Sequence, residues 1–528
     1  MFSKIYSTTL WGIDAHLVEV EVDVSQGLPS FHIVGLPDEA ITESKERVRA
    51  ALKNTGFVFP TKRVTVNLSP GDIKKEGVLF DLPIAIGILM STGQISPIFC
   101  NIDDYIFVGQ LSLNGLVKPI KGVLSISLLA KEMGKALIIP KENKDEGSII
   151  EGIDLYSVSS LPELVMFLKG EEKIDHVVTD YGDNSLFQEG YPYTPSYSVN
   201  FSEVRGQRHA KRAIQIAASG GHNIIMIGPP GAGKSMLAKR IPTILPPLTP
   251  DEAIEVTRIH SIKGLLKRDR PLITERPFRA PHSSSSLVSL VGGGRTSPIP
   301  GEITLAHNGV LFMDEFPEFR KDVLETLRQP LEDGYITISR ANYSIRFPAR
   351  PLLFVAAANP CSCGYYTDPE KECTCTPLQI IRYRAKLSGP LMDRIDIHID
   401  VPRLKYQDIR PGKNVSMEET SESIREKVIR AREIQEKRYR SLMPKMNIHL
   451  NSEIPPKYIH DFCILTESAE LLLKDAFVKL GLSGRAYTSI LKVSRTIADI
   501  EGKELIDDYA LSEAISYRSL DREVNFVL

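Results

Sequence analysis

The 528-residue chain has few of the features that mark secreted or membrane proteins. It contains only six cysteines and one tryptophan. Four of the six cysteines are clustered, which argues against a secreted disulfide framework. The N-terminus leads directly into an alternating strand pattern and lacks a signal-like apolar core. The most apolar run, Leu82–Met90, is interrupted by Pro83 and Gly87 and is too short to span a bilayer. We therefore expect a soluble, cytoplasmic protein without membrane contact.

The chain also lacks a strong charge of either sign. Its 64 Lys and Arg residues nearly balance 66 Asp and Glu residues, for a formal net charge of −2. Any nucleic-acid contact must therefore come from a local basic surface, such as a pore. The length exceeds what one hydrophobic core usually serves, so roughly two to four domains are expected.

Changes of pattern divide the chain into four blocks. Residues 1–170 alternate between strand and helix signals. Residues 171–200 are rich in acidic, aromatic, Gly, Ser and Pro residues, which predicts a linker. Residues 201–405 carry the motifs of a nucleotide site, and helical patterns dominate residues 406–528. This order predicts an N-terminal domain, a core and a helical lid.

A complete phosphate-binding loop lies between a predicted strand and a predicted helix. The apolar run 223–227 is followed by Gly228-Pro229-Pro230-Gly231-Ala232-Gly233-Lys234-Ser235. Backbone N–H groups of such a loop wrap an anion, and the helix adds the positive end of its dipole. Lys234 is expected to reach the β- and γ-phosphates, and the Ser235 hydroxyl to ligate Mg²⁺. Because strand, loop and helix agree, a simple Gly-rich turn is disfavoured, and ATP with Mg²⁺ is the predicted ligand.

Two further apolar runs end in polar residues. The run 310–313 leads into Asp314 and Glu315, and the run 352–358 leads into Asn359. Adjacent strand residues point to opposite faces, so the two acids should have different roles. Asp314 fits the position that holds Mg²⁺, and Glu315 fits the group that polarises the attacking water. Asn359 is placed to orient that water, because ligands lie beyond the carboxyl ends of such strands. The alternative is a strand end with solvated acids.

Further motifs extend over most of the chain. They are Phe201–Gln207, Arg276–His282, Pro300–Ile303, Leu305–Gly309, Leu327–Glu332, Asn359–Cys361, Gly389–Asp396 and Arg485–Tyr487. With these motifs and the loop, the chain resembles the AAA+ ATPases, and among them the magnesium-chelatase-like ComM/YifB family. The resemblance implies an α/β fold, in which an AAA+ P-loop core with a helical C-terminal lid follows an α+β Lon-protease-like N-terminal domain.

The resemblance also implies a homo-hexameric ring with sites between subunits. Arg394 matches the arginine finger that reaches a neighbour's γ-phosphate, although a structural ion pair with Asp393 or Asp396 is the alternative. Arg485 resembles the lid arginine that senses nucleotide in cis, and a solvated cation at a helix start is its alternative. Arg495 is either a second sensor or a surface residue.

The N-terminal block resembles the fold shared by the Lon proteolytic domain and the C-terminal domain of the recombination factor RadA. The resemblance is carried by Lys74–Gly77, Gly109–Gly115 and Ile138–Asn143. It places Asp81 near the nucleophilic Ser of a protease and Leu124 where the activating Lys would be. A Ser-Lys dyad needs a hydroxyl and an amine. This block is therefore expected to be catalytically silent and to form a ring or contact DNA.

The four clustered cysteines form two close pairs. Cys361 and Cys363 are separated by nine residues from Cys373 and Cys375. Two such pairs can close a tetrahedral Zn²⁺ site, and the intervening segment would form a small knob beside Asn359. The C-x-C spacing is less specific than C-x-x-C. Free thiols, a redox pair and unrelated structural cysteines are the alternatives.

Two segments are candidates for contact with DNA. Residues 282–300 are rich in Ser and Gly and suit a mobile loop, or a plain surface loop. Alternating patterns at 335–339 and 343–347 predict a hairpin whose tip carries Arg340 and Asn342, with Arg346 nearby. Repeated around a ring, such tips would line a channel with positive charge. A hairpin tip without a ligand is the alternative.

Three functions are compatible with these features. The first is an ATP-driven DNA motor, a helicase or branch-migration factor that acts on single-stranded or branched DNA beside recombinase machinery in natural transformation. The second is a chelatase-type remodelling subunit that serves insertion of Mg²⁺ into a porphyrin. The third is an ATP-dependent protease or unfoldase, which the missing dyad disfavours.

Overall fold

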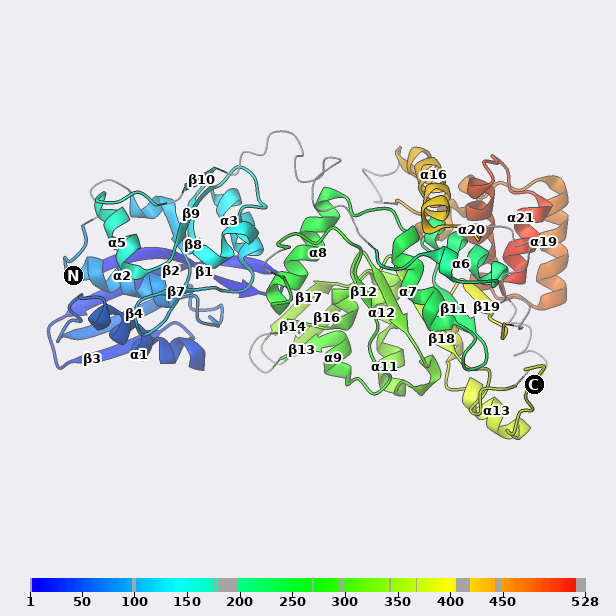
Figure 1. Ribbon diagram of the computed structural model, residues 1–528, viewed down its shortest axis with the longest axis horizontal. Helices are drawn as coiled ribbons and strands as arrows, with labels where there is room; N and C mark the ends of the chain where they lie inside the picture. Colours follow the sequence, from blue (N-terminus) through cyan, green and yellow to red (C-terminus); the bar gives the residue numbers. More distant parts are fainter. Residues whose placement is uncertain are drawn as a thin grey trace.

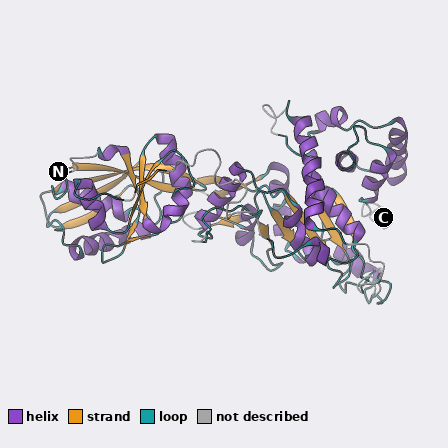
Figure 2. Ribbon diagram, turned by 45° about the horizontal axis from the view of Figure 1, so that its top comes forward, coloured by secondary structure: helices purple, strands orange, loops and turns teal. Residues whose placement is uncertain are grey.

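The computed structural model describes residues 2–96, 101–174, 176–178, 197–267, 270–294, 298–340, 343–366, 368–404, 418–441 and 448–518. The molecule is elongated, with the N-terminal domain at one end, the nucleotide-site core in the middle and the lid at the other end (Figure 1). Figure 2 shows that the N-terminal domain and the core each contain their own sheet, flanked by helices. Among the helices described, none combines the length and apolar character that a membrane crossing requires.

The N-terminal domain is built on an eight-stranded mixed sheet in the order β10-β9-β8-β5-β1-β2-β4-β3. In β2, Val18, Val20, Val22 and Val24 are buried and alternate with more exposed residues, so one face of the sheet packs on the core. The sheet continues to Val178, past the expected boundary at residue 170. The elements are β1 (Phe2–Trp11), β2 (Asp14–Ser25), β3 (Ser30–Val34), α1 (Glu39–Asn54), β4 (Arg63–Ser69), α2 (Asp81–Ser91), β5 (Tyr105–Phe107), β6 (Gln110–Leu111), β7 (Val117–Lys118), α3 (Val123–Met133), β8 (Ala136–Pro140), α4 (Lys144–Gly147), β9 (Asp154–Val158), α5 (Leu161–Lys169) and β10 (His176–Val178).

The core contains a five-stranded parallel sheet in the order β12-β15-β18-β11-β19. The three strands expected from the apolar runs are neighbours, and they are buried almost throughout, as parallel strands covered on both faces must be. The elements are α6 (Arg208–Gly220), β11 (Ile224–Ile227), α7 (Lys234–Ile244), α8 (Pro250–Lys263), β12 (Phe278–Arg279), α9 (Leu287–Val291), β13 (Gly292–Gly293), β14 (Ile299–Pro300), α10 (Glu302–Leu305), β15 (Val310–Met313), α11 (Lys321–Thr326), α12 (Arg328–Asp333), β16 (Tyr335–Arg340), β17 (Tyr343–Pro348), β18 (Leu353–Ala358), α13 (Pro377–Arg384), α14 (Gly389–Met392) and β19 (Ile397–Asp400).

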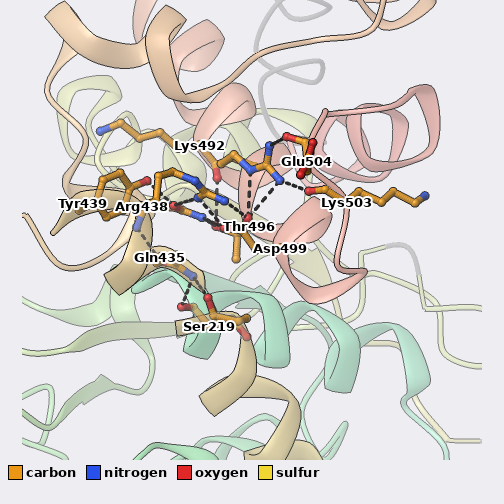
Figure 3. A network of polar contacts seen from close by, with 12 residues as sticks. Ser219, Gln435, Arg438, Tyr439, Lys492, Thr496, Asp499, Lys503 and Glu504 are labelled. Atoms are coloured by element: carbon orange, nitrogen blue, oxygen red, sulfur yellow. Dashed lines mark hydrogen bonds and ion pairs between the residues drawn. The ribbon is translucent and has the colours of Figure 1, made fainter. Parts of the chain in front are cut away.

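The C-terminal region, for which the name lid is kept below, is helical and packs on one face of the core. Apolar residues of the lid and of α6, α7 and β11 form one continuous buried cluster. Polar bonds add to this packing, because Gln435 Nε2 donates to the carbonyl of Ser219 over 3.0 Å (Figure 3). The elements are α16 (Ser421–Tyr439), α18 (Ile459–Phe462), α19 (Glu467–Leu480), α20 (Gly484–Ile500) and α21 (Asp508–Ser516).

Helix α8 of the core joins the N-terminal domain to the rest of the molecule. Ala253 and Val256 belong to the same buried cluster as the N-terminal sheet. At the same contact Ser261 Oγ accepts the N–H of Gly122 over 2.9 Å, and Arg258 forms a 2.8 Å ion pair with Asp14. The helix therefore lies between the two sheets (Figure 1). Its apolar residues complete the hydrophobic cluster of the N-terminal domain.

Candidate ATPase site

The loop after β11 is open on the side where an anion would bind. Gly231 and Gly233 have φ angles of +80° and +93°, which L side chains rarely adopt. A Cβ built at either glycine meets no atom within 4 Å, so the space over the loop is free. Helix α7 begins at Lys234, directly after the loop. The backbone thus presents N–H groups and a helix start to the same open space.

Lys234 is buried at the base of this loop. Its Nζ donates to the carbonyls of Gly228 and Pro229 over 2.6 and 3.0 Å, and to Asn359 Oδ1 over 3.2 Å. The side chain is 7 % exposed, and burial lowers the pKa of Lys234. The structure therefore brings together the ends of β11 and β18, as the sequence predicts for Lys234 and Asn359.

Ser235 and Asp314 are also brought together. Ser235 Oγ donates to Asp314 Oδ2 over 2.6 Å, and the N–H of Glu315 donates to Asp314 Oδ1 over 2.9 Å. Glu315 is exposed and has a φ of +51°. The two acids diverge as predicted but for another reason: β15 ends at Met313, so a left-handed turn and not the strand pleat separates them.

These residues fit a magnesium-bound nucleoside triphosphate. A lysine cation whose hydrogen-bond acceptors are all neutral oxygens lies below an open nest of N–H groups, which suits phosphate oxygens. A hydroxyl and a carboxylate oxygen 2.6 Å apart offer the hard oxygen ligands that Mg²⁺ prefers. When bound, such a metal neutralises charge on the phosphates during phosphoryl transfer.

Arg394 and Arg485 share one acidic partner, Glu332 of α12. Arg394 Nη2 lies 2.5 Å from Glu332 Oε1, and Arg485 Nη2 lies 3.3 Å from the same oxygen. Within the described residues, Arg394 pairs with neither of its neighbours Asp393 and Asp396. The hydrogen bond that Arg394 donates to Glu332 holds the pKa of the Glu332 carboxyl below its usual range.

The backbone of Arg394 and the phosphate loop lie at opposite ends of strand β11. Asn223, just before β11, donates its Nδ2 to the carbonyl of Arg394 over 3.0 Å. Strands β11 and β19 run parallel, with Ile224 beside Ile397. The loop follows the carboxyl end of β11, and a four-residue strand spans about 13 Å. The backbone of Arg394 therefore lies near the amino end of β11, at the opposite end of that strand from the loop.

Glu332 is the residue that sequence reasoning missed. It falls inside a motif, Leu327–Glu332, that was given no role. Its two partners lie 62 and 153 residues away in the sequence. No local spacing signals such a contact.

The protease-like site of the N-terminal domain contains an ion pair. Asp81 is fully buried, and Arg47 donates to its two oxygens over 2.7 and 3.1 Å. The N–H of Leu111 donates to Asp81 over 3.1 Å, and Leu124 is buried in the apolar core. The position expected for a nucleophile is thus filled by a carboxylate that is already fully paired.

The predicted hairpin is present. Strands β16 and β17 pair antiparallel from Tyr335 opposite Pro348 to Arg340 opposite Tyr343. The Arg346 guanidinium lies 4.8 Å from the centre of the Tyr335 ring. Asn342 and the side chain of Arg340 lie outside the described residues, so their predicted contact with DNA stays a prediction. Of the predicted loop 282–300, residues 295–297 also lie outside them.

The four clustered cysteines converge after β18. Their sulfur atoms all lie within 4.8 Å of one another, and Cys361 is buried while the other three are half-buried. The predicted grouping of Cys361, Cys363, Cys373 and Cys375 is therefore present. Cys463, elsewhere, is buried in the lid.

Comparison with known proteins identifies the family. Models described as magnesium chelatase, subunit ChlI, and as its C-terminal part match residues 200–409 and 418–518, and a further ChlI model matches residues 20–143. The competence protein ComM of Haemophilus influenzae is 44% identical over 98% of this chain and 97% of its own length. The chain belongs to the magnesium-chelatase-like ComM/YifB family. The uncharacterized protein YifB of Escherichia coli is 40% identical over the same shares of the two chains.

Family membership implies an AAA+ ATPase that binds ATP and Mg²⁺. A likeness to Lon protease 2 of Bacillus subtilis is partial, at 34% identity over 28% of this chain and 29% of that protein. This ComM/YifB protein therefore combines a magnesium-chelatase-like α/β core with a region of partial Lon likeness.

Proposed function

We propose that this protein is an ATP-driven DNA motor that works as a homo-hexameric ring, moving single-stranded or branched DNA during recombination of incoming strands. One observation carries the proposal. The phosphate loop follows the carboxyl end of β11, whereas the backbone of Arg394 lies near the amino end of that strand, and Arg485 shares its Glu332 partner. Each subunit thus holds two half-sites that only neighbouring copies can complete.

The roles of the site residues follow from their places. The loop residues 228–233 would hold the phosphates through backbone N–H groups, with Lys234 supplying positive charge. Ser235 and Asp314 would hold Mg²⁺. Glu315, exposed beside them, would take the proton of the attacking water, and Asn359 would orient that water.

Arg394 would act on the γ-phosphate of the neighbouring subunit. A guanidinium there stabilises charge that develops in the transition state, an effect worth about 10³–10⁵ in rate for such fingers. Arg485 shares Glu332 with Arg394, and we infer that it faces the same neighbour rather than its own nucleotide.

The DNA-contacting element we propose is the β16–β17 hairpin, with Arg340, Asn342 and Arg346. Its buried base, which includes Ile336 and Phe347, packs into the core cluster that also contains Phe316, just beyond the site acids. A shift at the acids would therefore be transmitted to the hairpin through packed side chains. In a ring of six copies, the hairpin arginines would follow a DNA backbone.

The remaining assignments are part of this proposal. The N-terminal domain is catalytically silent, since Asp81 replaces the hydroxyl that a protease needs. The protein acts in the cytoplasm beside recombinase machinery, with ATP and Mg²⁺ as cofactors and Zn²⁺ at the four cysteines. The name of the ComM relative, a competence protein, supports a role in handling incoming DNA.

A chelatase-type remodelling subunit is the second candidate. The description of the matching family models favours it. An N-terminal domain packed on α8 and a cysteine cluster beside the site fit the ComM-like motor better than a compact chelatase subunit.

The test compares ATP hydrolysis by the purified protein with no DNA, single-stranded DNA and forked DNA. A motor should hydrolyse ATP several-fold faster with DNA, and the stimulation should weaken as salt rises, because phosphate contacts release counterions. A rate that ignores DNA, with no salt-dependent retention of DNA, would exclude the motor and leave the chelatase candidate.

A further inference from the structure

The geometry of the cysteine cluster matches a tetrahedral metal centre. The Sγ–Sγ distances are 3.3 Å for Cys361–Cys363, 3.7 Å for Cys361–Cys373 and 3.5 Å for Cys363–Cys373. Four sulfurs at the zinc–sulfur distance of about 2.3 Å would be about 3.8 Å apart, whereas a disulfide requires about 2.05 Å. The spacing suits a shared ion and not a sulfur–sulfur bond.

Backbone donors complete the surroundings of the sulfurs. The N–H of Tyr366 donates to Cys361 Sγ over 3.4 Å, and the N–H of Cys363 donates to Cys375 Sγ over 3.4 Å. N–H groups directed at sulfur stabilise thiolates, which are the form that binds a metal. The donor set of four thiolates favours zinc or iron among biological metals.

The segment between the cysteine pairs rests on the phosphate loop. Gly364 has a φ of +86°, and its N–H donates to the carbonyl of Cys361 over 3.1 Å. A Cβ at Gly364 would lie 2.7 Å from Pro230 Cδ and 2.8 Å from Pro230 Cγ. The backbone of the cysteine segment therefore touches the residue that begins the turn of the loop.

The same segment is joined to the catalytic strand end. Cys361 follows Asn359 by two residues, and Asn359 accepts the hydrogen bond from Lys234. Arg384 of α13 lies 5.1 Å from the Tyr366 ring centre and donates to the carbonyl of Pro360 over 3.5 Å. So short a segment has no hydrophobic core of its own, and a crosslink is needed to hold it.

We propose that the four thiolates bind one zinc ion, and that the zinc-held segment braces the phosphate loop through Gly364 and Pro230. The zinc is structural, because all four ligands come from the protein and no position is left for a substrate. It is a positioning centre for the nucleotide site. The proposed role of the brace assumes that the loop binds nucleotide, as in the proposed function. It does not depend on whether the protein binds DNA.

The metal is tested first, on full-length protein purified without chelator, by metal analysis. We expect one zinc per chain, its loss in the Cys373→Ser, Cys375→Ser double variant, and its retention in Cys373→His, since imidazole is also a zinc ligand. Thr374→Ala, an exposed change between two ligands, is the matched control and should keep its zinc. A chain without metal, or with iron in place of zinc, would overturn the assignment.

The brace is tested by the affinity for a fluorescent ATP analogue. Gly364→Ala should keep its zinc but lose about tenfold or more in affinity, because the added Cβ displaces Pro230. Gly502→Ala is the control: its φ is +70°, but a Cβ there meets no atom within 4 Å. Removal of zinc by a chelator should weaken binding similarly, and added zinc should restore it.

Unchanged nucleotide affinity in Gly364→Ala and in the zinc-depleted protein would refute the brace. These results are separable from the proposed function. If the wild-type protein bound no nucleotide, the motor would be excluded, while the zinc content would still decide the metal centre.

Discussion

At the scale of single residues, the charge of Lys234 is hydrogen-bonded but not neutralised. Its three acceptors are two backbone carbonyls and the Asn359 amide oxygen. Burial disfavours the charged form and lowers the pKa of Lys234, and the nearby Asp314 carboxylate offsets only part of this effect. A phosphate group brought to the open loop would offset that penalty, so the site favours an anion.

Replacing this lysine should weaken nucleotide binding. We expect Lys234→Ala to lower affinity for ATP about 10- to 100-fold, the worth of a hydrogen bond to a charged group. Titration calorimetry would measure it. Lys239→Ala, an exposed lysine on the same helix, is the control and should bind normally. Normal affinity in Lys234→Ala would mean that the triphosphate binds elsewhere.

Glu332 should matter for turnover and not for binding. It holds the Arg394 and Arg485 guanidinium groups together. In Glu332→Gln the two cations lose their shared counter-charge and Arg394 loses its fixed orientation, so we expect kcat to fall about tenfold with KM nearly unchanged. Glu325→Gln, on the preceding helix, serves as control. A change in KM alone would show that Glu332 acts on nucleotide binding instead.

The contrast between Lys234 and Glu332 shows what sequence can predict at this scale. Lys234 and Ser235 begin α7 directly after the phosphate loop, and Asp314 directly follows β15, so the local pattern of strand, loop and helix is enough to predict where they lie. The partners of Glu332 come from two other segments, and only the fold brings them together. Arg495 illustrates another limit: its partner Asp499 is four residues along the same helix, a spacing that also occurs on exposed helix faces, so the spacing alone does not show that the pair is buried.

At the scale of elements, the apolar runs predicted three strands that are indeed neighbours, and alternation predicted the hairpin. The role of α8 could not be predicted in this way. Its sequence specifies an apolar face, but not that the face is buried against the N-terminal sheet instead of the core. A periodic pattern of apolar residues predicts which face of a helix or strand is buried. It does not predict which other element packs against that face.

The lid is held together by a buried polar network around α20 (Figure 3). Arg495 is 1 % exposed and pairs with Asp499 over 3.0 Å. Arg438 and Asn451 also bond to Asp499, and Thr496 bonds to His222 of the core over 2.7 Å. The alternatives for Arg495 were a sensor or a surface residue, and its full burial rules out the surface.

Breaking this network should destabilise the lid. Arg495→Leu would leave Asp499 with one cation fewer in a buried site, for which we expect a loss of about 3–5 kcal/mol in the free energy of unfolding. Urea unfolding followed by circular dichroism would measure it. Lys503→Ala, which removes an exposed pair with Asp507, should change little. If both variants unfolded alike, the network would not be a source of lid stability.

At the scale of the whole molecule, the two half-sites of the proposed function lie at opposite ends of β11. A head-to-tail contact of this kind differs from a two-fold dimer, because the loop edge of one copy meets the arginine edge of the next. Such a contact closes into a ring when the rotation between neighbouring copies permits it, and a ring of six copies is the assembly proposed above. The lid packs on the core of its own chain, so core and lid would move together against a neighbour.

Subunit mixing tests this arrangement. Glu315→Gln should bind ATP without hydrolysing it, and Arg394→Ala should also bind ATP and fail to hydrolyse it. When the two are mixed in equal amounts, the loop of an Arg394→Ala copy can meet the arginine of a Glu315→Gln copy. That pairing restores a complete site in about one of four interfaces, because each lesion then lies at a different interface.

The recovered ATPase rate should follow the product of the two subunit fractions and be greatest in the equal mixture. A chain carrying both substitutions, mixed with either single variant, is the control, since none of its interfaces with that variant has both groups intact. Recovery in the first mixture alone would place Arg394 in the neighbour's site. If neither mixture recovered activity, although each variant still assembled and bound ATP, the arginine would have to act on its own subunit. Strand β11, which spans about 13 Å, separates the backbone of Arg394 from the phosphate loop of its own subunit. Action of Arg394 on its own subunit is therefore the outcome that is harder to reconcile with the fold.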